Sequence, residues 1–202
     1  MSRTVDLSRK PALLAEVLDY LLDKPLATLT FRSLAEGLGV STYTLVYHFG
    51  SRAQLIHEIV SAITERQDVV VRAITAEEGD ISAHLANLRR SWKLSLAPRA
   101  RQLQRLEFEA AMLEMREPGT QSASLTMFRR WHQVGVAALV AMGLDTDDAE
   151  IEARTITDTI YGLHYDLIVS RDEARVSAAF ERAILAYEER LVGLLGDERR
   201  SA

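Results

Sequence analysis

Residues 30–49, TFRSLAEGLGVSTYTLVYHF, constrain the fold more than any other stretch of the sequence. Apolar side chains at positions 31, 34, 35 and 38 have the i, i+3, i+4, i+7 spacing of one helix face. Gly39 follows, at a point where a sharp corner requires a left-handed backbone that glycine adopts most easily. Ser41 is a suitable N-cap for a second helix that buries Leu45 and Phe49. The stretch therefore predicts two short helices joined by a tight turn.

The outward face of the second predicted helix places large side chains in water. Its members are Thr42, Tyr43, Val46 and Tyr47. An exposed face of this composition is typical of a docking surface. A helix-turn-helix whose second helix lies in the major groove of DNA accounts for the turn, the buried face and the exposed face together.

The rest of the chain is also predicted to be helical. Only 10 Gly and 4 Pro occur in 202 residues, and no regular strand-type alternation is visible. The absence of Cys excludes a disulfide framework and a thiolate metal site, and it fits a reducing compartment. No signal peptide is recognisable, and no stretch approaches the roughly 18 apolar residues that a membrane span requires. We expect an all-α, cytoplasmic protein that needs no membrane and no cofactor.

The helical pattern suggests two domains. A first helix begins near Ser8, and a long helix runs from Arg52 to about residue 74, which is more than a small head needs. The acidic segment 77–80 and the pair at 118–119 mark breaks. We predict an N-terminal three-helix head with its connecting helix at residues 1–76, and a helical ligand-binding and dimerisation domain at residues 77–202. The last two helices have apolar stripes that either complete a monomeric core or pair with their copies in a homodimer.

Residues 8–63 resemble the TetR family of bacterial transcriptional regulators, most densely over 30–41 and 45–52. The family pattern ends the recognition helix with Leu-Tyr-Tyr/Trp-His-Phe and reaches Lys or Arg after a short turn. Val46 stands at the first aromatic position of that run, and Tyr43 stands where a small residue or Pro is common. Both positions face DNA in the family. The resemblance therefore implies a DNA-binding regulator with an operator preference of its own, and beyond residue 81 only a helical dimerising and ligand-binding domain.

Nine residues of the motif are candidates for DNA contact: Thr30, Arg32, Thr42, Tyr43, Thr44, Val46, Tyr47, His48 and Arg52. The exposed helix face would contact base edges and thymine methyl groups. Thr30, His48 and Arg52 would contact phosphates, and Arg32 is a candidate for either role. The alternatives are that Tyr47 or His48 only packs between the head helices and that Arg52 is a solvated charge.

Net charge alone does not indicate DNA binding. The chain has 24 Lys and Arg against 29 Asp and Glu, and residues 1–60 contain six of each kind. A nonspecific polyanion binder would be far more basic. A specific protein that approaches phosphates with helix N-termini, hydroxyls and a few placed cations need not be. We therefore expect a homodimer that binds two half-sites of double-stranded operator DNA.

Eight residues after position 80 are candidates for a mostly apolar ligand site: Trp92, Phe108, Met112, Met127, Trp131, Tyr161, His164 and Tyr165. Core packing is the alternative for each of them. Tyr161 and His164 are the better candidates because a polar tip on an inward face requires a partner. We expect a small apolar or aromatic effector that shifts the population away from the operator-bound state and releases a repressor.

Two other functions remain as alternatives. The effector could act as a co-repressor, and Tyr43 and Tyr47 could instead contact another protein in a helical interaction module. An enzyme is not expected, because the sequence contains no Gly-rich phosphate loop, no Gly-x-Ser-x-Gly turn and no His-Glu-x-x-His pair. The five histidines also show no i, i+4 pairing that would suggest a metal.

Overall fold

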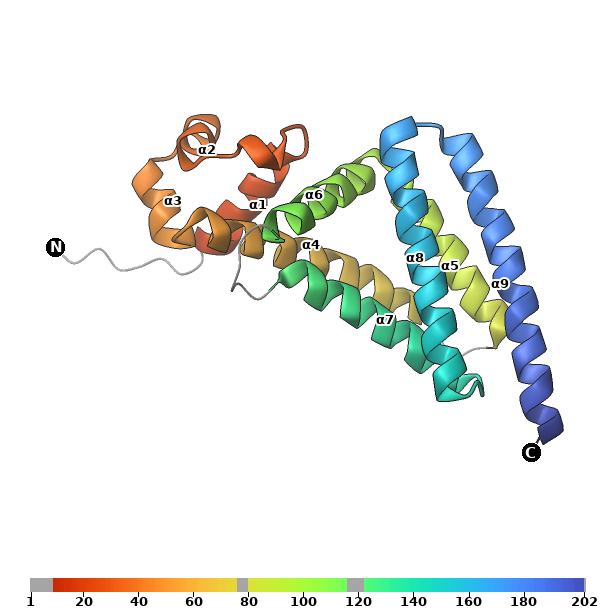
Figure 1. The fold of residues 1–202 in the computed structure, drawn as a ribbon. Coiled ribbons are helices and arrows are strands. Elements are labelled where there is room, and N and C mark those ends of the chain that lie inside the picture. The colour runs from red at the N-terminus through yellow and green to blue at the C-terminus, as the bar shows by residue number, and fades with distance from the viewer. Residues whose placement is uncertain (1–8, 76–79, 116–121, 202) are drawn as a thin grey trace. The chain divides into compact units, whose positions relative to one another are not determined.

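The computed structural model describes residues 9–75, 80–115 and 122–201. Across these ranges helices are the only regular secondary structure, which confirms the predicted all-α class (Figure 1). No helix in them offers an apolar stretch long enough to pass through a bilayer. The helices are α1 (Arg9–Leu21), α2 (Phe31–Leu38), α3 (Thr42–Phe49), α4 (Arg52–Thr75), α5 (Ile81–Ser95), α6 (Pro98–Glu114), α7 (Ala123–Ala141), α8 (Thr146–Ser170) and α9 (Glu173–Ser201).

The first four helices agree with the sequence prediction. Helices α2 and α3 are the two short helices expected within residues 30–49, and α4 is 24 residues long, as expected for the helix that starts at Arg52. A short 3-10 turn, η1 (Leu26–Thr28), lies between α1 and α2. Ser8, near which the first helix was expected to begin, lies outside the described residues, as do residues 77–79 of the predicted break at 77–80 and the break at 118–119. Asp80, the last residue of the first break, is the N-cap of α5.

The helices form two compact units. The first consists of Met1–Gln67 and Gln102–Leu125, and the second of Asp68–Arg101 and Thr126–Ala202. The division falls inside α4, inside α6 and inside α7. Most of α6 thus belongs to the same unit as the helix-turn-helix, although it comes from the second half of the chain. The predicted domain boundary between 76 and 77 lies outside the described residues and stays a prediction.

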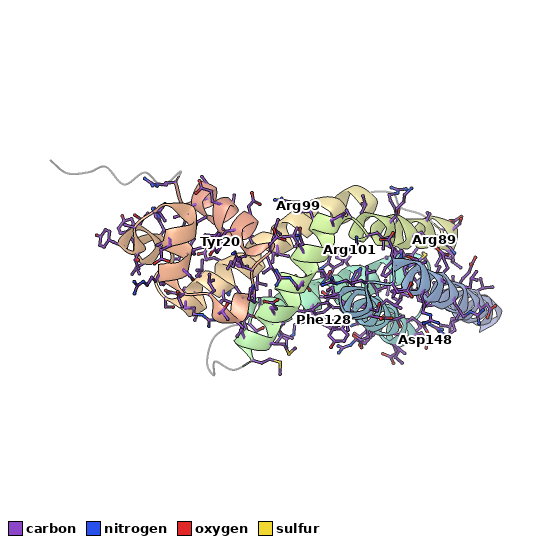
Figure 2. All side chains as sticks on the ribbon, turned by 90° about the horizontal axis from the view of Figure 1, so that it is seen from above. Tyr20, Arg89, Arg99, Arg101, Phe128 and Asp148 are labelled. Carbon is purple, nitrogen blue, oxygen red and sulfur yellow. The ribbon has the colours of Figure 1, made fainter. Side chains whose placement is uncertain are left out.

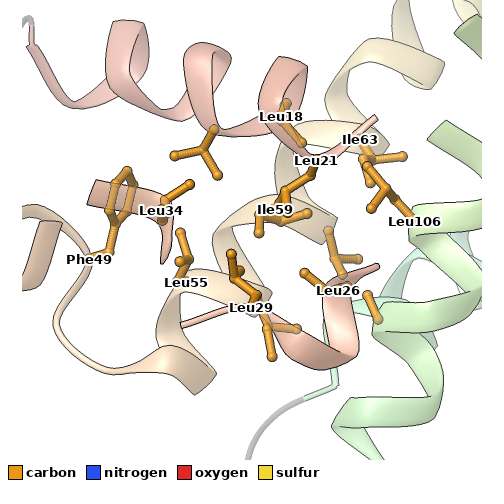
Figure 3. Close-up of a cluster of buried hydrophobic side chains, with 14 of the residues drawn as sticks. Leu18, Leu21, Leu26, Leu29, Leu34, Phe49, Leu55, Ile59, Ile63 and Leu106 are labelled. Atoms are coloured by element: carbon orange, nitrogen blue, oxygen red, sulfur yellow. The ribbon is translucent and has the colours of Figure 1, made fainter. Parts of the chain in front are cut away.

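The core of the first unit contains buried side chains from α1, α2, α3, α4 and α6 (Figure 3). Leu34 of α2, Leu45 of α3 and Ile59 of α4 are completely buried in one cluster. Leu106 and Ala110 of α6 belong to the same cluster and are also completely buried. Burying one such leucine contributes about 1.5–3 kcal/mol. Helix α6 is therefore part of the core that supports α2 and α3.

Helices α1 and α2 approach each other closely at a glycine. A Cβ atom at Gly37 would lie only 2.1 Å from Cε2 of Tyr20, whose ring is labelled in Figure 2. The Tyr20 hydroxyl donates a hydrogen bond of 3.3 Å to the carbonyl oxygen of Ser33. The close approach and the hydrogen bond together hold α2 against α1.

The second unit has a separate core built from α5, α7, α8 and α9. Arg89 of α5 donates to Glu181 of α9 at 2.9 Å, and Arg190 of α9 donates to the buried Glu152 of α8 at 3.0 Å. The wide apolar stripe predicted for the last helix is buried as expected at Val176, Phe180, Ile184, Tyr187, Leu191 and Leu195.

Candidate DNA-binding interface

Local hydrogen bonds define the beginning and end of the two short helices. The Thr30 side chain accepts from the backbone N–H of Ser33 at 3.0 Å, and Ser33 Oγ accepts from the backbone N–H of Thr30 at 3.1 Å, a complete capping box. Gly39 ends α2 with φ +66°, the left-handed conformation predicted for the corner. The Ser41 hydroxyl then accepts from the N–H of Thr44 at 3.0 Å and starts α3.

Helix α3 has one buried face and one exposed face. Leu45 and Phe49 are 0% and 2% exposed and anchor the helix in the core. Tyr43 is 77% exposed, Tyr47 53% and Val46 45%, and Thr42 is exposed beside them. A contiguous exposed face of aromatic and apolar side chains is typical of an interaction site.

The two exposed tyrosines already contact each other. Their ring centroids are 6.3 Å apart with an angle of 25° between the planes, and the His48 ring meets Tyr47 edge-on at 5.1 Å. An α-helix with its side chains is about 10–12 Å in diameter, and the major groove is about 12 Å wide. Helix α3 thus offers two phenol hydroxyls, a threonine hydroxyl and the apolar Val46 on a surface of the size that the groove admits.

The remaining polar candidates on α2 and α3 are exposed to different degrees. Arg32 is largely exposed, and its Nε donates to Glu36 at 3.3 Å, a surface pair that costs little to break. Thr30 is exposed at the start of α2, where its hydroxyl bonds within the capping box. Thr44 is half-buried and its hydroxyl lies 2.8 Å from that of Ser41. His48 is half-buried against Tyr47, in line with the packing alternative.

Arg52 has a role that sequence reasoning missed. Its Nε donates to the carbonyl oxygen of Leu29 at 3.0 Å, and its Nη2 donates to those of Leu26 and Ala27 at 3.2 and 3.3 Å. The guanidinium therefore holds the segment that leads into α2. It is not simply a solvated charge, and a phosphate contact by Arg52 stays a prediction. Nothing in the sequence pattern indicated that these carbonyl groups needed a donor.

Comparison with known proteins extends the description from the motif to the whole chain. No protein-family model and no curated protein matches the sequence. A TetR transcriptional regulator from Legionella pneumophila has a similar structure, with a TM-score of 0.70, 16% identity and coverage of 94% of this chain and 98% of that chain. NalD, the secondary repressor of the MexAB-OprM multidrug efflux pump in Pseudomonas aeruginosa, is similar with a TM-score of 0.60 and 13% identity, over 91% of this chain and 94% of that chain. A single-residue variant of TetR from Acinetobacter baumannii AYE, in complex with minocycline, is similar with a TM-score of 0.51 and 19% identity, over 98% of each chain.

The chain has the TetR-family fold. The resemblance stated for residues 8–63 is thereby confirmed for the fold, and it extends through the helices that carried no recognisable motif. At identities of 13–19% the agreement concerns the backbone.

The eight ligand candidates are divided between the two compact units. Phe108 and Met112 of α6 belong to the first unit, where they line a shallow hollow of about 530 Å³ together with Ala27, Glu109 and Leu113. The other six candidates belong to the second unit. Trp92 and Met127 are buried there, Trp131, Tyr161 and His164 are half-buried, and Tyr165 is 62% exposed.

Trp92 lies at the centre of an aromatic stack in the second unit. Its indole is nearly parallel to the Phe180 ring at 4.6 Å and to the His164 ring at 5.2 Å. Its Nε1 donates to the hydroxyl of Ser177 at 3.2 Å. Tyr161 lies apart from this stack and meets the ring of Phe128 edge-on at 5.6 Å. Two of the predicted ligand residues, Trp92 and His164, are thus in direct contact.

Hydrogen bonding fixes the protonation of the His164 ring. The Ser95 hydroxyl donates its only proton to the carbonyl oxygen of Trp92 at 2.7 Å, so it must accept from His164 Nε2, which lies 3.1 Å away. Burial lowers the pKa of His164 from 6.5 to about 4, because the charged ring would lose its hydration. At neutral pH the ring is therefore uncharged, with its proton on Nε2.

Proposed function

We propose that this protein is a sequence-specific DNA-binding transcriptional regulator, a repressor that leaves a palindromic operator when a small ligand binds. The observation that carries the proposal is the exposed face of α3, where Tyr43, Val46 and Tyr47 project from a helix anchored by Leu45 and Phe49. Regulators with this backbone fold include NalD, which is described as a repressor. A binding protein of this kind, not an enzyme, is the function that these side chains support.

The even charge balance of the head is compatible with specific binding. Part of the charge in the first unit is used internally, since Lys10 pairs with Glu58 at 2.5 Å and Arg52 bonds to backbone carbonyls. Affinity would then depend on hydroxyl contacts to phosphates and on the side chains that meet base edges. The candidates remain the nine residues predicted from the sequence, with Tyr43, Val46 and Tyr47 as the groove contacts best supported by exposure.

We propose a homodimer formed through the last two helices. Helices α8 and α9 bury one face in the second unit and leave large apolar side chains exposed on the other. These are Ile151, Tyr165, Val169, Leu185 and Val192, each more than half exposed. A second copy of the chain covering this face would bring two α3 helices to half-sites about 34–36 Å apart, one turn of DNA.

The proposed effector is small and apolar or aromatic. Trp92 and Phe180 are buried in a stack of parallel rings, and the half-buried His164 at the end of this stack is the ring that a flat ligand would reach. The similar TetR variant from Acinetobacter is described with minocycline bound. A ligand that prefers the released state 100-fold would supply about 2.7 kcal/mol towards release. In this proposal residues 1–76 bind DNA in the cytoplasm and residues 77–202 bind the ligand and the second subunit.

Selection of bound sequences from random duplex DNA tests the proposal. We expect enrichment of a palindrome with two equal half-sites, and absence of any enrichment would refute DNA binding. Affinity should fall steeply with salt as counterions are released from DNA. A salt-insensitive protein contact through Tyr43 and Tyr47 would instead identify an interaction module. If the effector acts as a co-repressor, its addition will raise operator affinity.

Tyr47→Ala is the sharpest single substitution. The side chain is 53% exposed and lies outside the buried clusters of the first unit, so its loss should leave the fold intact. We expect at least about a fivefold loss of operator affinity, because a base contact contributes about 1–3 kcal/mol. Titration of a labelled operator measures it, and the fold is checked by circular dichroism. Unchanged affinity would remove Tyr47 from the interface.

A further inference from the structure

The end of α1 and the turn that follows it are held by one arginine from α6. Arg105 Nη2 donates to three backbone carbonyl oxygens, those of Leu21 at 2.9 Å, Leu22 at 3.0 Å and Lys24 at 3.2 Å. These groups lie at a helix C-terminus, where carbonyl oxygens lack partners within the helix. The two hydrogens of Nη2 are therefore shared among the last turn of α1 and the residues beyond it, where the Leu21 carbonyl oxygen also accepts from the backbone N–H of Lys24 at 3.2 Å.

The neighbouring carboxylate on α6 holds the next part of the same connection. Glu109 Oε2 accepts a hydrogen bond of 2.6 Å from the backbone N–H of Leu26, the first residue of η1. Arg105 Nη1 donates to the other oxygen, Oε1, of Glu109. The two side chains are one helical turn apart and form a single unit, the α6 clamp, defined here as Arg105 with Glu109.

The charges of the α6 clamp match the backbone groups that they meet. The cation lies at the C-terminal carbonyl groups of α1, and the anion lies at the N–H group that begins η1. Each charge thus faces the end of a helical segment that attracts it. The two side chains are only 25% and 28% exposed, which limits screening by solvent.

The clamped connection leads directly into the helix-turn-helix. After η1 the chain passes the buried Leu29 and reaches Thr30, which caps α2. From its other side the same connection is held by Arg52, the first residue of α4. Side chains of α4 and of α6 therefore both form hydrogen bonds with the connection between α1 and α2. The position of this connection determines where α2 begins and where α3 follows.

We propose that Arg105 and Glu109 are positioning residues for DNA binding: they fix the α1–α2 connection and so set the placement of α2 and α3. This rests on the proposed function, because its first readout is operator affinity. An ordinary i, i+4 ion pair on a helix surface contributes only a few tenths of a kcal/mol and would have no such effect. The four backbone contacts distinguish this pair from one of that kind.

Two substitutions in the full-length protein test the proposal. Arg105→Met and Glu109→Leu keep a long apolar stem and a strong helix former but remove the backbone contacts. The control is Arg154→Met on α8, whose partner Asp158 is also an i, i+4 neighbour but whose pair is more than half exposed. We expect both clamp variants to lose at least about tenfold in operator affinity, which is 1.4 kcal/mol, while the control changes less than twofold.

The readouts separate positioning from a general loss of stability. Affinities are measured at a temperature at which circular dichroism shows every variant folded, and they are measured for the operator and for unrelated duplex DNA. Loss confined to the operator supports positioning, because phosphate contacts remain while the base contacts are displaced. A lower melting temperature with unchanged operator affinity would overturn the proposal. Glu109→Gln, which keeps an acceptor for Leu26, should lose less affinity than Glu109→Leu.

Amide hydrogen exchange tests the α6 clamp without DNA. Exchange over residues 26–49 should accelerate in Glu109→Leu and Arg105→Met and remain unchanged in Arg154→Met. Unchanged exchange in the clamp variants would refute the positioning role. If the wild-type protein selects no duplex DNA, the proposed function fails, and the exchange experiment still decides whether the clamp positions α2 and α3.

Discussion

The half-buried His164 makes the stability of the second unit depend on pH. Its pKa is about 4 in the folded protein, against 6.5 for a fully hydrated histidine. Between these values the unfolded chain binds a proton that the folded chain does not, so unfolding becomes easier as the pH falls. The stabilisation is complete above pH 6.5 and is lost progressively towards pH 4. The two pKa values give a loss of about 2 kcal/mol at pH 5 and about 3 kcal/mol at pH 4, as upper limits.

His164→Phe isolates this contribution. In the wild type the centroids of the Trp92 and His164 rings lie 5.2 Å apart. Phenylalanine keeps a flat ring against Trp92, but it cannot bind a proton. At pH 7.5 the variant should be less stable by the hydrogen bond to Ser95, about 1 kcal/mol. At pH 5 the wild type loses about 2 kcal/mol through His164 and the variant does not. The difference in the free energy of unfolding between the wild type and the variant should therefore change sign between pH 7.5 and pH 5.

The free energy of unfolding is measured by urea unfolding of both proteins at both pH values, at one fixed protein concentration. Burial also lowers the pKa of His84, which lies 3.2 Å from the Tyr187 hydroxyl, but that contribution is common to wild type and variant and cancels in the difference. His57→Phe, at an exposed position of α4, serves as the control. A difference between wild type and His164→Phe that is equal at pH 7.5 and pH 5 would refute the argument.

Two further substitutions test the support of the helix-turn-helix. Gly37→Ala should destabilise the first unit by about 1–3 kcal/mol, because the new methyl group would lie 2.1 Å from the Tyr20 ring; urea unfolding measures this, and a neutral result would show that Tyr20 moves aside at no cost. Leu106→Ala should cost about 2–5 kcal/mol and accelerate amide exchange in α2 and α3 as well as in α6, since Leu106 is completely buried in their common core. Acceleration limited to α6 would contradict a shared core.

The helix-turn-helix could be predicted from the sequence because its determinants are local. Thr30, Gly39 and Ser41 act within a few residues of their own positions, and the structure places each at the predicted helix end. The exposure of Tyr43 and Tyr47 follows from the same helical periodicity once Leu45 is assigned to the core. Patterns of this kind need no knowledge of distant contacts.

Contacts over long sequence distances could not be predicted in the same way. An amphipathic pattern shows that α6 buries one face, but it does not show which core receives it, and Leu106 lies in the core of the head. The carbonyl groups of the α1–α2 connection give no sequence signal, so the roles of Arg52 and Arg105 were missed. For the same reason Phe108 was grouped with Trp92, although the two belong to different compact units.

In the proposed ligand site, the single tautomer of His164 restricts which polar groups a ligand can offer to this ring. Because Nε2–H is used by Ser95, the nitrogen left for a ligand is Nδ1, which at neutral pH only accepts hydrogen bonds. A polar group that meets the ring must therefore be a donor, such as a phenol or an amide N–H. A carboxylate would instead meet the lone pair of Nδ1 and would repel it as long as the ring is uncharged.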